Sequence, residues 1–362
     1  MLKPAFFRVV IFLAAVYSYQ TGNAQVIADQ RLSQASAVTQ TIGISTVSVK
    51  YSRPSVNGRE IWGKLVPYGW NKEREGNGSD APWRAGANEN TVLQLSHAAT
   101  VAGHPVPAGS YGLFFVINKD NSGEVILSKD FKSWGNYFYD PKQDEMREKI
   151  TILDVPTITE QLTYSFDHLS KNSAMLELNW EKKQFPVKIE FALDDIVLAN
   201  AAEELKGVNG FDWQSYNSAA KYCLDNKVHL DQGLQWADQA IARNPNYTDL
   251  HTKAELLDLQ GLHSEAEKVY QEALPKANEL ETNNYGYQLL AKNQFEKAIA
   301  LLKANAEKYP TSANVWDSLG EAYALSGDKK KAILNFKKSL GLNPIPAVRA
   351  NSEKYLKQLG AM

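Results

Sequence analysis

Apolar residues change their spacing once along this chain, near residue 205, and the change divides it into two halves of different secondary structure. From about Val38 to Phe191 they recur at every second position, which predicts strands with one buried face. Short strands without intervening helices predict an antiparallel β-sandwich or a barrel. From about Phe211 onward the spacing becomes that of α-helices. The expected organisation is a β domain at 34–195, a linker at 196–210 and an α-helical domain at 211–362.

The helical half contains a repeated pattern. Its last full copy, at 312–344, carries in order Trp316, Leu319, Gly320, Tyr323, Gly327, Ala332, Phe336 and Pro344. Pro310 and Pro344 are 34 residues apart, and this spacing resembles the tetratricopeptide repeat (TPR), which stacks helical hairpins into a solenoid. Four repeats and a capping helix at 347–359 are expected. Three repeats are the alternative because the first two copies are irregular, and a generic helical bundle is the fallback.

The TPR resemblance implies that fixed positions of each first helix line a concave groove. In this frame the groove residues are Ser218, Tyr222, Asp225, His251, Glu255, Asp258, Asn283, Tyr287, Asp317 and Glu321. These residues make the groove acidic and lack the basic residues with which one known mode of the family clamps a terminal carboxylate. The prediction is a protein partner bound through a basic or neutral polar segment. The alternative is that the charges only solvate a spacer.

Aromatic and arginine residues gather in three stretches of the β half, at 51–70, 82–91 and 133–147. Aromatic platforms beside forked arginine donors and short amides suit a sugar ring, a planar group or an anion. The alternative is that these side chains staple long loops onto the sheets. The candidate ligand-binding residues are Tyr51, Arg53, Trp62, Trp83, Arg84, Asn88, Glu89, Trp134 and Tyr137.

Long motifs of the β half occur in a fixed order: QTIG, TVSVKYSRPSVNGREIWGKLVPYGW, WRAGANENT, PAGSYGLF, SWGNYFYDP, LTYSF and LNWEK. From Gln34 to Phe191 they resemble DUF2911, a family of exported bacterial domains without an assigned function. The resemblance implies a bacterial, exported setting and supplies no catalytic residues. This chain carries an additional polar stretch, Asn71 to Pro82, that is expected to shape or cover a pocket.

The N-terminus has the layout of a secretory signal peptide. Two basic residues precede an apolar run from Val9 to Tyr19, and Gly22 and Ala24 occupy the positions expected before a cleavage site. The apolar run is about half of the ~20 residues that a bilayer requires, which favours cleavage after residue 24 over a stable membrane span. The expected location is the periplasm or the extracellular space of a bacterial envelope.

Composition excludes several classes of protein. The net charge is -2 and the pI about 6.3, so there is no overall basic field to hold nucleic acid. The single cysteine, Cys223, excludes an intrachain disulfide and every cysteine-rich metal site. The sequence has no HExxH motif, no GxSxG motif and no complete GxxxxGK[ST] phosphate loop. No metal, cofactor or catalytic residue is therefore predicted.

The leading functional prediction is an exported, non-enzymatic protein whose β domain recognises a small ligand or envelope component and whose repeats dock a protein partner. One alternative is an envelope enzyme acting on glycan or peptidoglycan, with its site among Arg53, Trp83, Arg84, Asn88 and Glu89. Another is a purely architectural protein in which both halves bind proteins.

Overall fold

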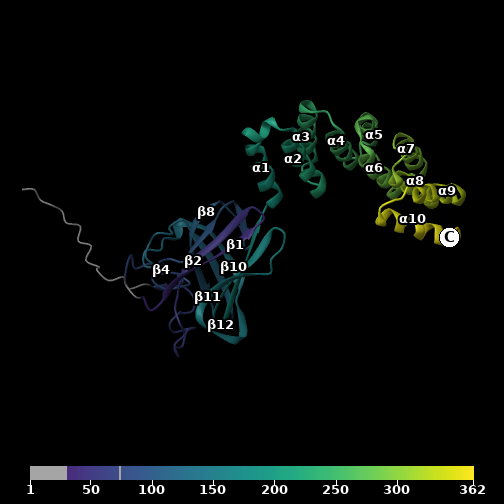
Figure 1. The fold of residues 1–362 in the computed structure, drawn as a ribbon. Helices are drawn as coiled ribbons and strands as arrows, with labels where there is room; N and C mark the ends of the chain where they lie inside the picture. Colours follow the sequence, from purple (N-terminus) through teal and green to yellow (C-terminus); the bar gives the residue numbers. More distant parts are fainter. Residues whose placement is uncertain (1–30, 73–74) are drawn as a thin grey trace, which may run out of the picture. The chain divides into compact units, whose positions relative to one another are not determined.

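The computed structural model describes residues 31–72 and 75–362 (Figure 1). The chain forms two compact units that divide between Leu193 and Asp194. The expected signal peptide at 1–24 lies outside the described residues. Within the described part of the chain, no helix combines the length and the apolar character needed to cross a bilayer.

The first unit is built from antiparallel β-sheets. The six-stranded sheet has the order β1 (Gln34–Ile42), β2 (Ser45–Arg53), β5 (Val92–Leu95), β8 (Gly109–Ile117), β9 (Ser122–Ser128) and β10 (Asp144–Thr151). The four-stranded sheet has the order β11 (Leu153–Asp167), β12 (Ser173–Phe191), β6 (Ala99–Val101) and β7 (His104–Val106). A short hairpin pairs β3 (Asn71–Lys72) with β4 (Asp80–Ala81). The predicted antiparallel β domain is confirmed, as open sheets rather than a closed barrel.

The core of the β unit lies between the two larger sheets. Phe115 on β8 and Phe185 on β12 are both fully buried, and their ring centroids are 5.2 Å apart. The alternating pattern predicts one buried face for β8, but Phe114 on the opposite face is only 2% exposed. Tyr139 and Trp70 pack over that second face. The third aromatic loop therefore covers the sheet, which the strand's own alternation does not indicate.

The second unit is a row of helical hairpins (Figure 1). The first helices of the hairpins are α2 (Trp213–Asn226), α4 (Tyr247–Leu259), α6 (Glu279–Ala291) and α8 (Ala313–Leu325). Their second helices are α3 (Leu230–Arg243), α5 (His263–Ala273), α7 (Phe295–Lys308) and α9 (Lys329–Gly341). The last helix, α10 (Pro346–Gln358), packs on the fourth hairpin. The prediction of four TPR hairpins and a capping helix is confirmed.

Small residues let the two helices of a hairpin approach closely. A Cβ atom on Gly286 of α6 would lie 2.6 Å from the Leu302 side chain, and one on Gly320 of α8 would lie 2.9 Å from Phe336. Phe336 is fully buried, so the ring has little room to move aside. These contacts give the physical reason for the glycines that the repeat pattern contains.

Most of the interval 196–210, expected as a linker, is helical. It contains the greater part of α1 (Leu193–Glu204) and most of a short 3-10 helix, Val208–Phe211. Leu198 is 7% exposed and belongs to one apolar cluster with Ala220 and Cys223 of the first hairpin. The apolar residues of α1 thus add a packing face to the first repeat. Cys223 itself is fully buried in this cluster.

Candidate ligand cavity and repeat groove

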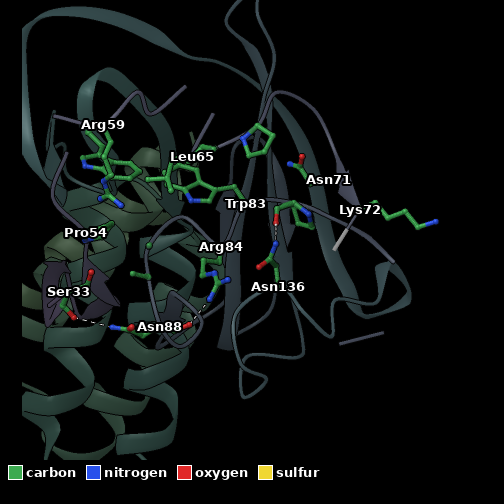
Figure 2. Close-up of a pocket in the computed structure, with 16 residues that line it drawn as sticks. Ser33, Pro54, Arg59, Leu65, Asn71, Lys72, Trp83, Arg84, Asn88 and Asn136 are labelled. Atoms are coloured by element: carbon green, nitrogen blue, oxygen red, sulfur yellow. Dashed lines mark hydrogen bonds between the residues drawn. The ribbon is translucent and has the colours of Figure 1, made fainter. Parts of the chain in front are cut away.

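The β unit contains a cavity of about 500 Å³ (Figure 2). All three of the aromatic and arginine-rich stretches contribute to its lining, with Arg59 from the first, Trp83, Arg84 and Asn88 from the second, and Asn136 from the third. Trp180 of β12 and Ser33 complete the polar and aromatic part of the wall. The inserted stretch 71–82 also contributes at both of its ends, through Asn71, Lys72 and Pro82.

Two rings of an aromatic cluster, Trp83 and Trp180, line the cavity. Trp83 stacks on Trp180 with ring centroids 5.8 Å apart and 14° between the planes. Trp62 lies edge-on to both tryptophans, at 5.6 Å and 5.9 Å. Paired backbone hydrogen bonds of 2.8 Å and 2.9 Å join Trp83 to Phe115 of β8. The loop that carries Trp83 is therefore anchored to the central strand, and the ring position is fixed by packing.

Arg84 is held in place on several sides. Its Nη1 donates to the backbone oxygen of Asn88 at 2.9 Å, and its guanidinium lies 4.9 Å from the centroid of the Tyr137 ring. Gly135 has a φ of 61°, and a Cβ atom there would lie 2.4 Å from Arg84 Nη1. The Asn88 side-chain amide in turn donates to the backbone oxygen of Ser33 at 3.1 Å. The structure thus brings together three predicted site residues, Arg84, Asn88 and Tyr137.

Other predicted ligand residues have structural partners. Arg53 does not line the cavity, because its guanidinium donates to the Leu162 oxygen at 3.0 Å and to Thr163 Oγ1 at 2.7 Å. Trp62 is likewise absent from the lining, and its indole nitrogen donates to Glu181 Oε2 at 3.2 Å.

Tyr51 and Glu89 line a second hollow of about 400 Å³ instead. Tyr51 packs edge-on against Tyr164 at 4.7 Å. Glu89 pairs with Arg31, and the hydrogen bond from that arginine is the main cause that lowers the pKa of the Glu89 carboxyl. Trp134 is half exposed, with the Arg31 guanidinium 5.9 Å from its ring centroid. The nine predicted residues therefore do not form a single site.

A separate polar cluster lies in the third loop, outside the cavity lining. The Tyr139 hydroxyl donates to Asp144 Oδ1 at 2.8 Å, and Arg147 Nη2 donates to Asp144 Oδ2 at 2.7 Å. The Arg147 guanidinium stands 4.6 Å from the centroid of the Trp70 ring. Burial is the main cause that raises the pKa of the Tyr139 hydroxyl. Arg147 thus lies on an aromatic ring, and the Asp144 carboxylate neutralises its charge.

Four cavity residues were not among the predicted site residues. Trp180 falls on the inward side of a regular strand, where the pattern predicts a core residue. Arg59 lies inside the first aromatic stretch, Asn136 lies inside the third, and Asn71 begins the inserted stretch. These stretches were the signal that could have placed the last three residues at the site.

Predicted groove residues of the helical unit bond to the next repeat. Lys292 Nζ donates to Asp258 Oδ2 at 2.8 Å, across a sequence separation of 34 residues. Tyr287 donates to Glu321 Oε2 at 3.1 Å, and Tyr355 of α10 donates to Glu321 Oε1 at 2.9 Å. The capping helix therefore occupies the place of a fifth first helix. The polar side chains of this face form a ladder that joins successive repeats.

Some groove carboxylates pair with lysine or histidine side chains. Asp258 bonds to Lys292 and to His263, and although burial acts to raise the pKa of Asp258, these two hydrogen bonds bring it below its usual value. Glu255 lies 3.3 Å from His251 Nδ1. Asp225 pairs with Lys221 at 3.0 Å within one helix.

At the C-terminal end the carboxylates receive only neutral donors. Asp317 accepts from Ser352 and, at 2.8 Å, from Asn351, while Glu321 accepts from two tyrosines. No lysine, arginine or histidine in the described ranges 31–72 and 75–362 lies within 4 Å of either carboxylate. Burial is the main cause that raises the pKa of Asp317, and burial together with Glu321 raises the pKa of Tyr355 to about 12.

Three further groove residues are Tyr222, Asn283 and His251, and the Nε2 atom of His251 lies 3.1 Å from Gln288 Oε1 of the next repeat. The Tyr222 hydroxyl donates to Asp194 Oδ1 at 2.7 Å, and Asn283 is 4% exposed. His251 packs among Tyr247, Tyr270 and Tyr285. In the described part of the chain, no group of three or more His, Cys, Asp and Glu side chains could hold a metal ion.

Comparison with known families matches most of the β unit. Residues 33–189 match the model of DUF2911, which is described as a protein of unknown function. The match confirms the resemblance that the ordered motifs indicate for this half. No curated protein matches the chain.

Several solved structures are similar to part of the chain. MamA from Desulfovibrio magneticus RS-1 is 20% identical over 38% of this chain and 76% of its own, with a TM-score of 0.28. PilF of Pseudomonas aeruginosa is 22% identical over 40% and 68%, with a TM-score of 0.30. YrrB, titled a TPR protein with an unusual peptide-binding site, is 16% identical over 44% and 84%, with a TM-score of 0.31. At these scores the likenesses carry no argument beyond the helical hairpins already described.

Proposed function

We propose that this chain is an exported, non-enzymatic binding protein of a bacterial envelope, whose β unit holds a small ligand and whose repeat unit docks a protein partner. The observation that carries the proposal is the cavity of about 500 Å³ on which all three aromatic loops converge. That volume lies within the roughly 300–1,000 Å³ of small-molecule sites, which are apolar pockets with a few placed polar groups. The indole, guanidinium and amide groups in the cavity lining can contact a ligand by ring packing and by hydrogen bonds. The N-terminal signal-peptide pattern supports export.

The repeat unit supports the second half of the proposal. Stacked helical hairpins create extended surfaces that repeat proteins use to bind partners. Glu321 is half-buried and lies toward the C-terminal end of the row, next to α10, while Asp317 beside it is only 4% exposed. An accessible carboxylate without a cation of its own favours a positively charged partner. The proposed partner therefore offers a basic or neutral polar segment to α8 and α10.

Peptide titration of the purified protein tests this docking. Basic, neutral polar and acidic peptides of equal length are titrated by calorimetry. We expect the basic peptide to bind most tightly, and Glu321→Gln to weaken it roughly threefold to tenfold because the charge is lost while an acceptor oxygen remains. The matched control is Glu353→Gln, since Glu353 of α10 faces Arg349 of its own helix at 3.9 Å. Preferential binding of the acidic peptide, or equal effects of both variants, would contradict the proposed docking surface.

A further inference from the structure

The described ionisable residues that line the β-unit cavity are all cationic: Arg59, Lys72 and Arg84. Among residues 31–72 and 75–362, no aspartate, glutamate or histidine contributes to the lining. Glu89 follows Asn88 directly, but its carboxylate pairs with Arg31 and lines the other hollow. The Lys72 side chain runs outward in Figure 2, away from the other labelled residues. The positive charge of the cavity is therefore carried by the two arginines.

Neither arginine has a carboxylate partner in the described part of the chain. Among the described residues, the acceptors of Arg59 are the backbone oxygens of Val56 and Ser55, and that of Arg84 is the backbone oxygen of Asn88. Arg84 is partly buried, and a guanidinium withdrawn from water without a carboxylate partner is energetically unfavourable. The contrast with Arg147 is direct, since Arg147 also lies on an aromatic ring but bonds to Asp144 at 2.7 Å. Arg84 is held by the fold and left without a counter-charge.

A second lining residue has an unused donor. Trp180 is 1% exposed, and its indole N–H has no acceptor among the described residues. Buried tryptophan N–H groups usually have a partner, and each exception requires an explanation. Trp180 contributes part of its side chain to the lining of the cavity. Trp83, stacked on Trp180, presents a flat apolar surface to the same space.

We infer that the cavity binds a small organic oxyanion, a carboxylate or a phosphate, whose charged group is held by Arg84 and whose ring or flat body lies against Trp83, while Arg59 adds positive charge at another part of the lining. The inference rests on the proposed function, because it specifies the ligand of the same site. Guanidinium forks match both oxyanions through paired N–H donors. Neutral ligands of equal shape would leave the arginines without a counter-charge, so they are expected to bind weakly.

Calorimetric titration of the purified protein separates these cases. The anionic probes are glucose 6-phosphate, glucuronate and benzoate, and their neutral counterparts are glucose and benzyl alcohol. We expect at least one anion to bind about tenfold more tightly than its neutral counterpart, and Arg84→Gln to weaken it by about tenfold or more. The control variant Arg147→Gln removes the other arginine that lies on a ring, and it should change the affinity by less than about twofold. Comparison of the phosphate probe with the two carboxylate probes shows which oxyanion the cavity prefers.

Each other outcome is informative. Neutral probes that bind as well as the anions would overturn the oxyanion inference while leaving a ligand-binding β unit. Equal anion affinity in Arg84→Gln and the unaltered protein would place the anion elsewhere and overturn it too. If no probe binds at about 10 mM, both the oxyanion inference and the proposal that the β unit binds a small ligand are contradicted. If Arg84→Gln fails to fold, Arg59→Gln replaces it, because Arg59 is exposed and its loss opens no core.

Discussion

The two units of this protein treat their charged side chains in opposite ways. In the helical unit, groove carboxylates such as Asp258 and Glu321 receive hydrogen bonds from the next repeat, at separations of 34 residues. In the β unit, stacked and edge-on aromatic rings hold the loops, and Arg59 and Arg84 have no carboxylate partner among the residues that the structure describes. The groove carboxylates thus help to join the repeats, whereas the two cavity arginines of the β unit pair with no described carboxylate.

This difference determines whether a mutation that changes ligand binding also changes the stability of the unit. A change in a groove carboxylate alters the bonds between repeats and the surface offered to a partner together, because one side chain serves both. A change in a cavity arginine removes charge from the cavity while the aromatic cluster stays intact. Mutations should therefore couple folding and binding in the helical unit and separate them in the β unit.

The largest expected effect concerns the two cores. Phe185→Ala in the β unit and Phe336→Ala in the helical unit each remove a fully buried ring, which costs about 3–5 kcal/mol of the free energy of unfolding. Because the rings belong to different compact units, each variant should lower one thermal transition and leave the other in place. Differential scanning calorimetry measures both. Equal shifts of both transitions in either variant would contradict the division into independent units.

A smaller effect follows from a buried carboxyl group of the helical unit. Asp249 is fully buried, and burial raises the pKa of its side chain to about 6, against which the hydrogen bond from Asn246 acts only in part. The folded state therefore binds the proton more tightly than the unfolded state, whose aspartate has a pKa of about 4. The contribution of this group to stability falls as pH rises from about 4 to about 6, and is constant above that range.

Asp249→Asn should remove this dependence. Relative to the variant, the unaltered helical unit should lose about 1–2 kcal/mol of unfolding free energy between pH 4 and pH 6.5. Urea unfolding of both proteins across that range measures the difference, with the β-unit transition as an internal control. A difference that stays constant with pH would show that Asp249 has an ordinary pKa.

The repeat half could be predicted closely from the sequence. Hairpin packing depends on local spacing, so glycines such as Gly286 and Gly320 mark the helix contacts directly. The antiparallel β half followed from alternation, but the covering of Phe114 by Tyr139 did not, because it depends on a loop distant in sequence. Local periodicity carries no information on such contacts.

The candidate ligand site was only partly predictable. Aromatic and arginine content identified the right loops, and Trp83, Arg84 and Asn88 do line one cavity. Residue type does not give side-chain direction, however, and Arg53 turned out to bond to β11 while Trp62 packs within the aromatic cluster. Trp180 was missed because its strand pattern is that of a core residue.

Scanning calorimetry of the purified protein with and without ligands tests the central claim most directly. Two transitions are expected, assigned by Phe185→Ala and Phe336→Ala. Glucose 6-phosphate, glucuronate or benzoate should raise only the β-unit transition, and a basic peptide only the helical one, because binding to a folded unit stabilises that unit. A single cooperative transition, or one ligand that raises both transitions together, would contradict the account of two separate binding units.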